Sequence, residues 1–269
     1  MINISAFIIT KNEASRVTRA INSVKDIAEE IIVVDSGSVD DTVSIAESLG
    51  AKVIFNEWPG YVKQKSFAES LCKNNWVLNI DADEELTQEL QAEIKQIFNS
   101  AKYNEYKAYE INFITIHRYD DQKARILAPS NGFIRLYDRN FCSFSNTKNA
   151  TTHDTVTFNI PTKANKNLVY KFKNHGYHRS AVSIEQLINK GNFYSTEQAK
   201  DLVIQGRFPS RIRIAFELPL FFLKVFIIRR YIVFGFNGFV DSIIFAFTRF
   251  VRLAKTRELY KKGQSENQK

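Results

Sequence analysis

The first hundred residues alternate between two hydrophobic periods, and this alternation constrains the fold more than any other feature. Four short apolar stretches have the length and composition of buried strands, at residues 4–10, 30–36, 51–57 and 76–83. In the intervening segments apolar residues recur at helical spacing, as Val17 and Ile21 do. Strands separated by such helices predict βαβ units, and therefore a mainly parallel sheet with helices on both faces.

Polar clusters follow the first, second and fourth of these strands. They are TKNE at residues 10–13, DSGSVDD at 35–41 and DADE at 81–84. Open α/β sheets bind ligands beyond the carboxyl ends of their strands, where the connecting loops converge. We therefore expect the three clusters to share one cleft.

The third cluster concentrates negative charge, since Asp81, Asp83, Glu84 and Glu85 directly follow an apolar run. Carboxylates at this density repel one another, and a divalent cation is a natural compensator. In an extended chain Asp81 and Asp83 would face the same way, so that both could approach one Mg²⁺ or Mn²⁺ ion. The alternative is that these acids only cap the following helix and complement its dipole.

The three motifs resemble those of the GT-A glycosyltransferases of family 2. FIITKNEA at 7–14, VVDSGSVDDT at 33–42 and NIDADE at 79–84 occur in the family's order and near its spacing. The lipopolysaccharide core β-glucosyltransferase-like subgroup is the most similar, because QKSFA at 64–68 and NGFIRLYDR at 131–139 also match. The resemblance implies the α/β GT-A fold, a Rossmann-like, mainly parallel central sheet flanked by helices, here with a C-terminal amphipathic helical extension.

The resemblance also implies a reaction and residues for it. The chain would be a metal-dependent, inverting hexosyltransferase that moves a hexose from a nucleotide-sugar donor, expected to be UDP-linked, to a lipid-linked glycan such as lipopolysaccharide core. Asp83 would bind Mg²⁺ or Mn²⁺ with His175 as a further metal contact, and Asp154 would be the catalytic base. Relatives often have His-Glu where this chain has His153-Asp154, and Asp138 is the reserve candidate for the base. The residues expected to bind the nucleotide sugar are Thr10, Asn12, Glu13, Asp35, Asp40, Lys65, Asp81 and Arg135.

Some of these assignments have plainer alternatives. Lys65 would equally suit a solvated helix face, and Arg135 would equally suit an ion pair with a nearby acid. His175 is also consistent with an ordinary hydrogen-bonded histidine. His117 and His178 are expected to be structural or solvated.

The net charge of +8 comes entirely from residues 209–262, which carry eleven Lys or Arg against three acids and ten of the 22 Phe. The longest uncharged run, 231–240, falls short of the roughly 20 residues of a membrane-spanning helix, so crossing is not expected. Basic and apolar residues in this mixture predict amphipathic helices on a membrane surface, with anionic lipids as partners. The alternative is packing on the catalytic domain or on a second subunit. Basic residues interleaved with Phe and aliphatic residues argue against nucleic acid as a partner.

We expect a catalytic domain at residues 1–208, made of a nucleotide-sugar-binding half at 1–103 and an acceptor-side half at 104–208. Basic, membrane-associating helices would follow at 209–262, and a flexible tail at 263–269.

The expected location is the cytoplasm, with peripheral attachment to the cytoplasmic face of the inner membrane. The N-terminus lacks a basic leader and is interpreted as a first strand. Cys72 and Cys142 lack metal or redox spacing and are expected to be reduced thiols. Two other functions stay open, a non-catalytic membrane-associated module that binds nucleotide sugars and a transferase acting on polyprenyl phosphate.

Overall fold

A computed structural model describes residues 3–120, 124–144 and 155–266. The chain divides into two compact units. Among these residues, the sheet unit comprises 3–114, 130–144 and 155–178, and the helical unit comprises 115–120, 124–129 and 179–266.

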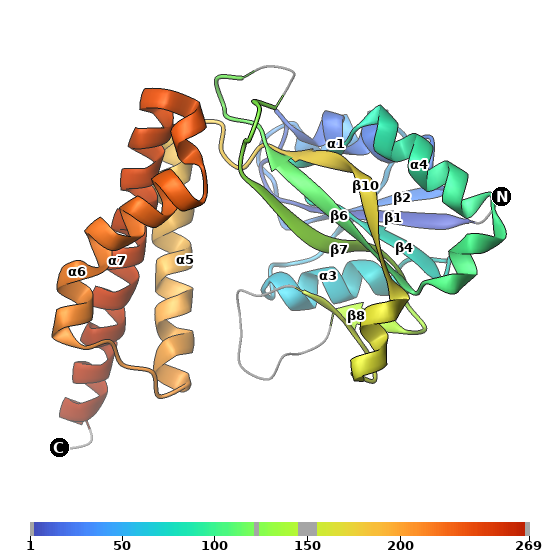
Figure 1. The fold of residues 1–269 in the computed structure, drawn as a ribbon. Helices are drawn as coiled ribbons and strands as arrows, with labels where there is room; N and C mark the ends of the chain where they lie inside the picture. The colour runs from blue at the N-terminus through green and yellow to red at the C-terminus, as the bar shows by residue number, and fades with distance from the viewer. Residues whose placement is uncertain (1–2, 121–123, 145–154, 267–269) are drawn as a thin grey trace. The chain divides into compact units, whose positions relative to one another are not determined.

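An eight-stranded sheet forms the centre of the sheet unit, with strand order β3-β2-β1-β4-β7-β6-β10-β5 (Figure 1). The strands are β1 (Ile4–Thr10), β2 (Glu30–Asp35), β3 (Lys52–Phe55), β4 (Trp76–Asn79), β5 (Glu84–Leu86), β6 (Ala108–Thr115), β7 (Ser130–Asp138) and β10 (Val169–His178). The first four are parallel, whereas β7 runs antiparallel to β4 and to β6, and β5 runs antiparallel to β10. A separate antiparallel pair joins β8 (Cys142–Phe144) to β9 (Val156–Phe158).

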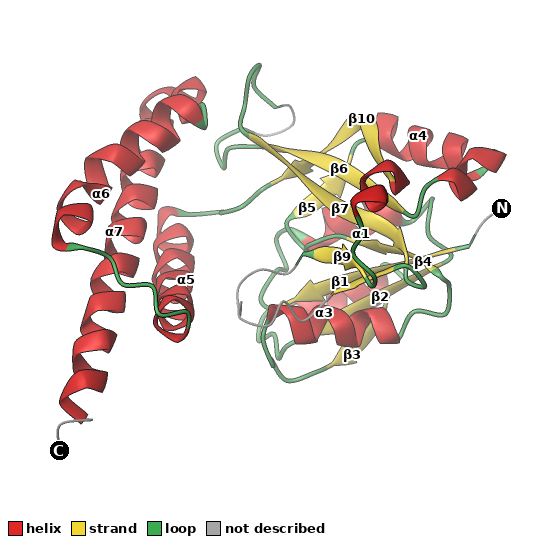
Figure 2. Cartoon of the chain, turned by 60° about the horizontal axis from the view of Figure 1, so that its bottom comes forward, coloured by secondary structure: helices red, strands yellow, loops and turns green. Residues whose placement is uncertain are grey.

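Helices cover both faces of this sheet (Figures 1 and 2). Apolar residues of α1 (Val17–Val24), α2 (Thr42–Ser48) and α4 (Gln88–Phe98) pack on one face, and α3 (Tyr61–Ser70) packs on the other with β8 and β9. Two 3₁₀ segments, η1 (Ala101–Glu105) and η2 (Lys163–Leu168), complete the unit. The predicted α/β fold with a mainly parallel central sheet is therefore confirmed.

Five segments form the C-terminal part of the helical unit. They are α5 (Ile184–Ile204), α6 (Arg211–Leu223), the π-helical η3 (Lys224–Ile228), the 3₁₀ segment η4 (Tyr231–Phe234) and α7 (Gly235–Glu266). Both α5 and α6 pack along α7, and Arg230 and Gly235, with φ of 63° and 60°, break the helix between α6 and α7. The predicted C-terminal helical extension is present.

The helix spanning Tyr231–Lys262 is long and apolar enough to cross a membrane by length and composition alone. Counting uncharged runs did not reveal this, because only Asp241 interrupts residues 231–248. A single charge shortens the run without making the stretch polar.

The predicted domain boundaries separate parts of the chain by their expected function, and they stay predictions. The compact units divide after His178, since α5 lies in the same unit as α7. Cys72 and Cys142 are both buried free thiols, and burial raises the pKa of each to about 12. Trp76 lies in the core against Phe98 and Tyr109.

Candidate active site

The loops that follow β1 and β2 are joined by hydrogen bonds. Asn12 adopts a left-handed backbone conformation with φ of 56°, which asparagine tolerates better than most residues. Its backbone N–H donates to Ser38 Oγ at 2.8 Å, and its Oδ1 accepts from the Val39 N–H at 2.9 Å. The first two polar clusters of the sequence thus lie together, as predicted.

Asp35 organises the second of these loops from the end of β2. Its carboxylate accepts from the N–H groups of Gly37 and Ser38, both at 2.8 Å, and from the hydroxyls of Ser38 at 2.5 Å and Thr10 at 3.2 Å. An ionised carboxylate has about four acceptor positions, so these donors account for all of them. A uracil N–H at Asp35 would have to replace one of the four.

Asp40 and Glu13 both form hydrogen bonds with Thr42, the first residue of α2. Asp40 accepts from the Thr42 N–H at 3.1 Å and the Ala14 N–H at 3.2 Å, and Thr42 Oγ1 accepts from the Glu13 N–H at 2.7 Å. Partial burial alone would raise the pKa of Asp40, but hydrogen bonds from the Thr42 hydroxyl and from the Ala14 and Thr42 N–H groups outweigh it and lower the pKa. Both residues therefore hold the loop after β1 against the start of α2.

The strand that leads to the acidic cluster is shorter than predicted. β4 ends at Asn79, and a turn brings the Glu84 N–H to the Asp81 carbonyl oxygen at 2.9 Å. The expectation that Asp81 and Asp83 face one way along an extended chain is therefore wrong. The two carboxylates contact different cations.

Asp81 lies between two buried cations. Its Oδ1 is 2.7 Å from Lys65 Nζ on α3, and its Oδ2 is 2.6 Å from Arg135 Nη2 on β7. Lys65 is fully buried and Arg135 is 5% exposed, whereas the Asp81 side chain keeps 31% exposure. Burial would raise the pKa of Asp81, but the charges of Arg135 and then Lys65 lower it to about 2. Asp81 is thus a fixed anion that opens to solvent at the end of β4.

Glu84 holds Arg135 from the other side. Its Oε1 lies 2.5 Å from Arg135 Nη2, and its Oε2 accepts from the Asp81 N–H at 3.0 Å. Burial raises the pKa of Glu84, and the charge of Arg135 offsets this only in part. Arg135 also donates to Asn79 Oδ1 at 3.1 Å. The ion-pair alternative for Arg135 is therefore realised, with Asp81 and Glu84 as its acids.

Asp83 contacts a separate pair of cationic groups, with longer distances. Arg16 Nη1 lies 3.7 Å from its Oδ2, and His178 Nε2 lies 3.6 Å from its Oδ1. Burial alone would lower the pKa of His178, but the negative charges of Asp83 and Glu84 raise it. Arg16, which is buried, also contacts Glu13 at 2.5 Å and so connects the third cluster to the first.

The remaining predicted site residues are His175, the proposed base Asp154 and the reserve base Asp138. β10 presents His178 toward Asp83, whereas His175, three residues earlier, lies beside Tyr177 with ring centroids 5.3 Å apart. Asp154 and His153 lie outside the described residues. Asp138 pairs with Trp76 at the start of β4, at the opposite end of that strand from the acidic cluster. The structure therefore does not bring Asp138 to this cluster, and its assignment as the reserve base stays a prediction.

Sequence reasoning missed two contributors to the site, Arg16 and His178, and gave Glu84 no role beyond membership of the acidic cluster. Arg16 stands three residues after Glu13 at the start of α1, a spacing that places the two side chains together and could have revealed the pair. No sequence signal identifies His178, because its position depends on the pairing of β10 with β5.

The carboxylates of the third cluster are the candidate ligands for Mg²⁺ or Mn²⁺. Within the described residues no three His, Cys, Asp or Glu side chains form a group that could hold a metal. Mg²⁺ commonly needs only one or two carboxylates, because substrate phosphates and water complete its shell. Asp83 could supply one such carboxylate, since its side chain is 14% exposed.

An α/β sheet whose parallel strands end in these linked acidic and basic loops is typical of enzymes that bind nucleotides at the strand ends. The sequence model of glycosyl transferase family 2 matches residues 5–177, and the chain belongs to this family.

Relatives agree with this assignment. An uncharacterized glycosyltransferase of Rickettsia bellii is 62% identical over 257 residues, covering 95% of this chain and 86% of the relative. The lipopolysaccharide core biosynthesis glycosyltransferase LpsC of Rhizobium meliloti is 27% identical over 260 residues, covering 94% and 91%. Among solved structures, glucosyl-3-phosphoglycerate synthase of Mycobacterium tuberculosis with Mn²⁺, UDP and glucosyl-3-phosphoglycerate has a TM-score of 0.46 at 15% identity, covering 78% of this chain and 81% of that one.

Proposed function

We propose that this glycosyltransferase moves a hexose from a UDP-sugar to a lipid-linked glycan with inversion of the anomeric centre. The observation that carries the proposal is Asp81, a solvent-open anion fixed between Lys65 and Arg135 at the end of β4. The resemblance to family 2 and the distant similarity to LpsC support a lipopolysaccharide-type acceptor.

The chain's own residues divide the work on the donor. The linked loops at Asn12 and Asp35 would receive the nucleoside, with Thr10, Glu13 and Asp40 holding their shape. Asp81 would accept from a ribose hydroxyl or a metal-bound water. Lys65 and Arg135 keep Asp81 ionised and oriented, which lowers the cost of ordering the site when the donor binds.

Asp83 would hold Mg²⁺ or Mn²⁺ next to the diphosphate. The resemblance assigns the further contact to His175, although β10 presents His178 toward Asp83 in the structure. When bound, such an ion stabilises the negative charge of the departing diphosphate. The cations already at Asp81 and Asp83 lower the net negative charge of the cluster, so the metal adds to a partly neutralised site. Asp154 is the proposed base that accepts the proton of the attacking acceptor hydroxyl.

Attachment to the cytoplasmic face of the inner membrane completes the proposal. A lipid-linked acceptor is confined to a membrane, and an enzyme held on the same surface meets it at a high local concentration. The excess of basic residues at 209–262 is consistent with this attachment.

The test is a screen of nucleotide sugars, with UDP release as the readout, Mn²⁺ present and membrane extract as the source of acceptor. We expect one UDP-sugar to give acceptor-dependent UDP release. Asp83→Ala should lower turnover about a hundredfold or more, because it removes charge stabilisation at the leaving group. Glu85→Ala is the matched control, since it removes a neighbouring carboxylate outside the proposed site and should keep most turnover.

Two outcomes would contradict the proposal. Retained turnover in Asp83→Ala would remove the metal assignment. Nucleotide binding without transfer or hydrolysis of any donor would favour a non-catalytic binding module instead. Asp154→Asn should keep donor binding and lose transfer, and normal transfer would place the base elsewhere.

A further inference from the structure

Three cations from different elements of the helical unit gather around one aromatic ring. Lys224 Nζ lies 5.9 Å from the centroid of the Phe221 ring, and the guanidinium carbons of Arg229 and Arg249 lie 5.6 and 5.1 Å from it. Each distance is within the range of a cation–π contact. The three charges therefore meet at the Phe221 ring, although Lys224 belongs to η3, Arg229 follows η3 and Arg249 lies midway along α7.

This cation cluster, Lys224, Arg229 and Arg249 around Phe221, has more positive charge than its acidic neighbours balance. Glu217 contacts Arg249 at 2.7 Å and also lies 3.7 Å from Arg213. Lys224 and Arg229 are exposed, and neither forms an ion pair with an acid in the part of the chain that the structure describes. The cluster thus presents uncompensated charge to solvent.

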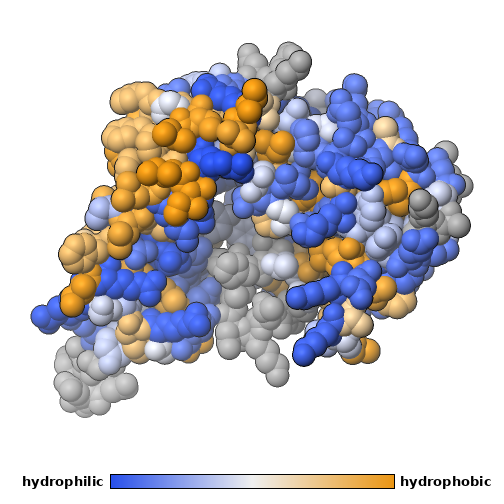
Figure 3. All heavy atoms as spheres, in the orientation of Figure 1, coloured by the Kyte–Doolittle hydropathy of each residue, from blue (hydrophilic) through white to orange (hydrophobic). Residues whose placement is uncertain are grey.

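Large apolar side chains are exposed beside the cluster. Ile228 is 74% exposed, Ile232 52% and Phe236 78%. Figure 3 shows hydrophobic residues gathered over the end of the helical unit where α7 begins. A contiguous exposed apolar patch bordered by cations is typical of a membrane-contacting surface.

We propose that this face binds an anionic phospholipid bilayer. Lipid phosphates would bind the cation cluster, while Ile228, Ile232 and Phe236 enter the boundary between headgroups and acyl chains. Long Lys and Arg side chains can lie along apolar surface and keep their charges at the headgroup level, which matches their convergence on Phe221. This membrane face would hold the enzyme where a lipid-linked acceptor lies. Its biological role therefore rests on the proposed function.

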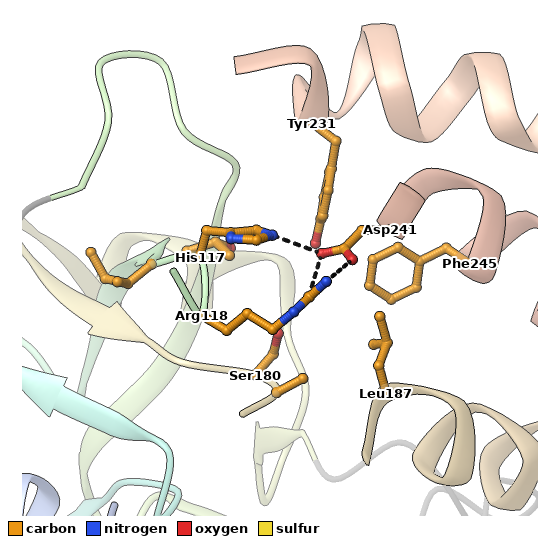
Figure 4. A pocket seen from close by; sticks show the side chains of 10 residues that line it. His117, Arg118, Ser180, Leu187, Tyr231, Asp241 and Phe245 are labelled. Atoms are coloured by element: carbon orange, nitrogen blue, oxygen red, sulfur yellow. Dashed lines mark hydrogen bonds and ion pairs between the residues drawn. The ribbon is translucent and has the colours of Figure 1, made fainter. Parts of the chain in front are cut away.

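The same unit contains a reason why α7 docks on a membrane rather than crossing it. Asp241, in the middle of the apolar stretch, accepts two hydrogen bonds from Arg118, at 2.7 and 2.9 Å, and lies 3.2 Å from His117 (Figure 4). Both partners come from the segment between β6 and β7. A spanning α7 would either draw this segment into the bilayer or leave a charged carboxylate in hydrocarbon, and both are unfavourable.

Binding of the full chain to sucrose-loaded vesicles tests the proposal. We compare vesicles of phosphatidylglycerol and phosphatidylcholine with vesicles of phosphatidylcholine alone, and expect binding to the former that weakens with salt. Each basic residue near an anionic surface contributes about a factor of five, so Lys224→Gln with Arg229→Gln should weaken binding roughly thirtyfold. The matched control, Lys52→Gln with Lys95→Gln, removes two exposed charges from the sheet unit and should change binding less than about twofold.

Further measurements give the remaining outcomes. At high salt the charges are screened, and the remaining binding should come from apolar insertion. Phe236→Gln should weaken this salt-resistant binding. Trypsin added outside sealed vesicles should cleave at Lys261 and Lys262, whereas protection of this end would show a spanning helix and overturn the docking mode. Equal binding to both vesicle types, unchanged binding of the double variant, or a dimer in solution that the double variant dissociates would overturn the membrane face.

The two proposals can fail separately. UDP release from the donor in solution does not require the membrane face, so the Lys224 and Arg229 variant should keep it. Vesicle binding without turnover would refute the proposed function alone, and turnover without vesicle binding would refute the membrane face alone.

Discussion

Lys65 shows how a single buried charge can shape the candidate site. Its ammonium group is fully buried, 2.7 Å from Asp81 and 5.7 Å from the centre of the Phe144 ring. A buried charge is tolerated only when a counter-charge is held in good geometry. The ion pair therefore fixes Asp81 at the end of β4, and it does so before any ligand binds.

Asp81→Asn should destabilise the protein by about 2 kcal/mol, below the 3 to 5 kcal/mol typical of a fully buried pair because Asp81 is partly exposed. Lys65→Met should restore part of the loss when added to Asp81→Asn, since it removes the buried charge that has lost its carboxylate. Urea unfolding of the two single variants and the double variant gives the coupling energy. Additive effects would show that the pair does not contribute to stability.

β10 shows what close packing between strands demands of the sequence. A methyl group at Gly176 would lie 2.5 Å from Phe113 Cε1 on β6 and 2.9 Å from the Glu85 carbonyl oxygen on β5. Neither a packed ring nor a strand backbone can move freely. A glycine at this position therefore allows β10 to fit between its two neighbours.

Gly176→Ala should lower the free energy of unfolding by about 1 to 3 kcal/mol, the usual cost of overpacking. Gly132→Ala is the matched control, because its added methyl group would meet only the flexible end of the Glu110 side chain at 2.4 Å. Thermal unfolding of both variants provides the comparison. Equal losses would mean that the contact with Phe113 relaxes more easily than the geometry implies.

Elements defined by local hydrophobic periodicity were predictable from the sequence, and those defined by distant pairing were not. β1 matches its predicted range, Ile4–Thr10, and α1 spans Val17–Val24, where Val17 and Ile21 recur at helical spacing. The three residues of β5 carry no periodicity, and their pairing with β10 decides that His178 faces the acidic cluster. The resemblance to family 2 supplied most of the candidate residues, whereas the pairing of Lys65 and Arg135 with Asp81 required the fold.

Considered as a whole, the chain places its acidic chemistry and its excess positive charge in different compact units. The linked loops and the Asp81 cluster belong to the sheet unit, and the cation cluster around Phe221 belongs to the helical unit. The segment between β6 and β7 leaves the sheet and contributes His117 and Arg118 to the helical unit. Integrity of the helical unit therefore depends on residues far from its helices in sequence.

Asp241→Asn should destabilise this unit by about 3 kcal/mol at neutral pH, because Arg118, with its side chain 4% exposed, would lose its carboxylate partner. Burial alone would raise the pKa of Asp241, but hydrogen bonds from His117 and Arg118 outweigh it and lower the pKa below 3.8. A carboxyl group with a lowered pKa stabilises the fold above its unfolded pKa, and this contribution disappears as the pH falls through the folded pKa. The difference between wild type and variant in urea unfolding should thus be constant above about pH 5 and shrink below about pH 4. A difference that stays unchanged under acid conditions would show that Asp241 acts through packing and not through its charge.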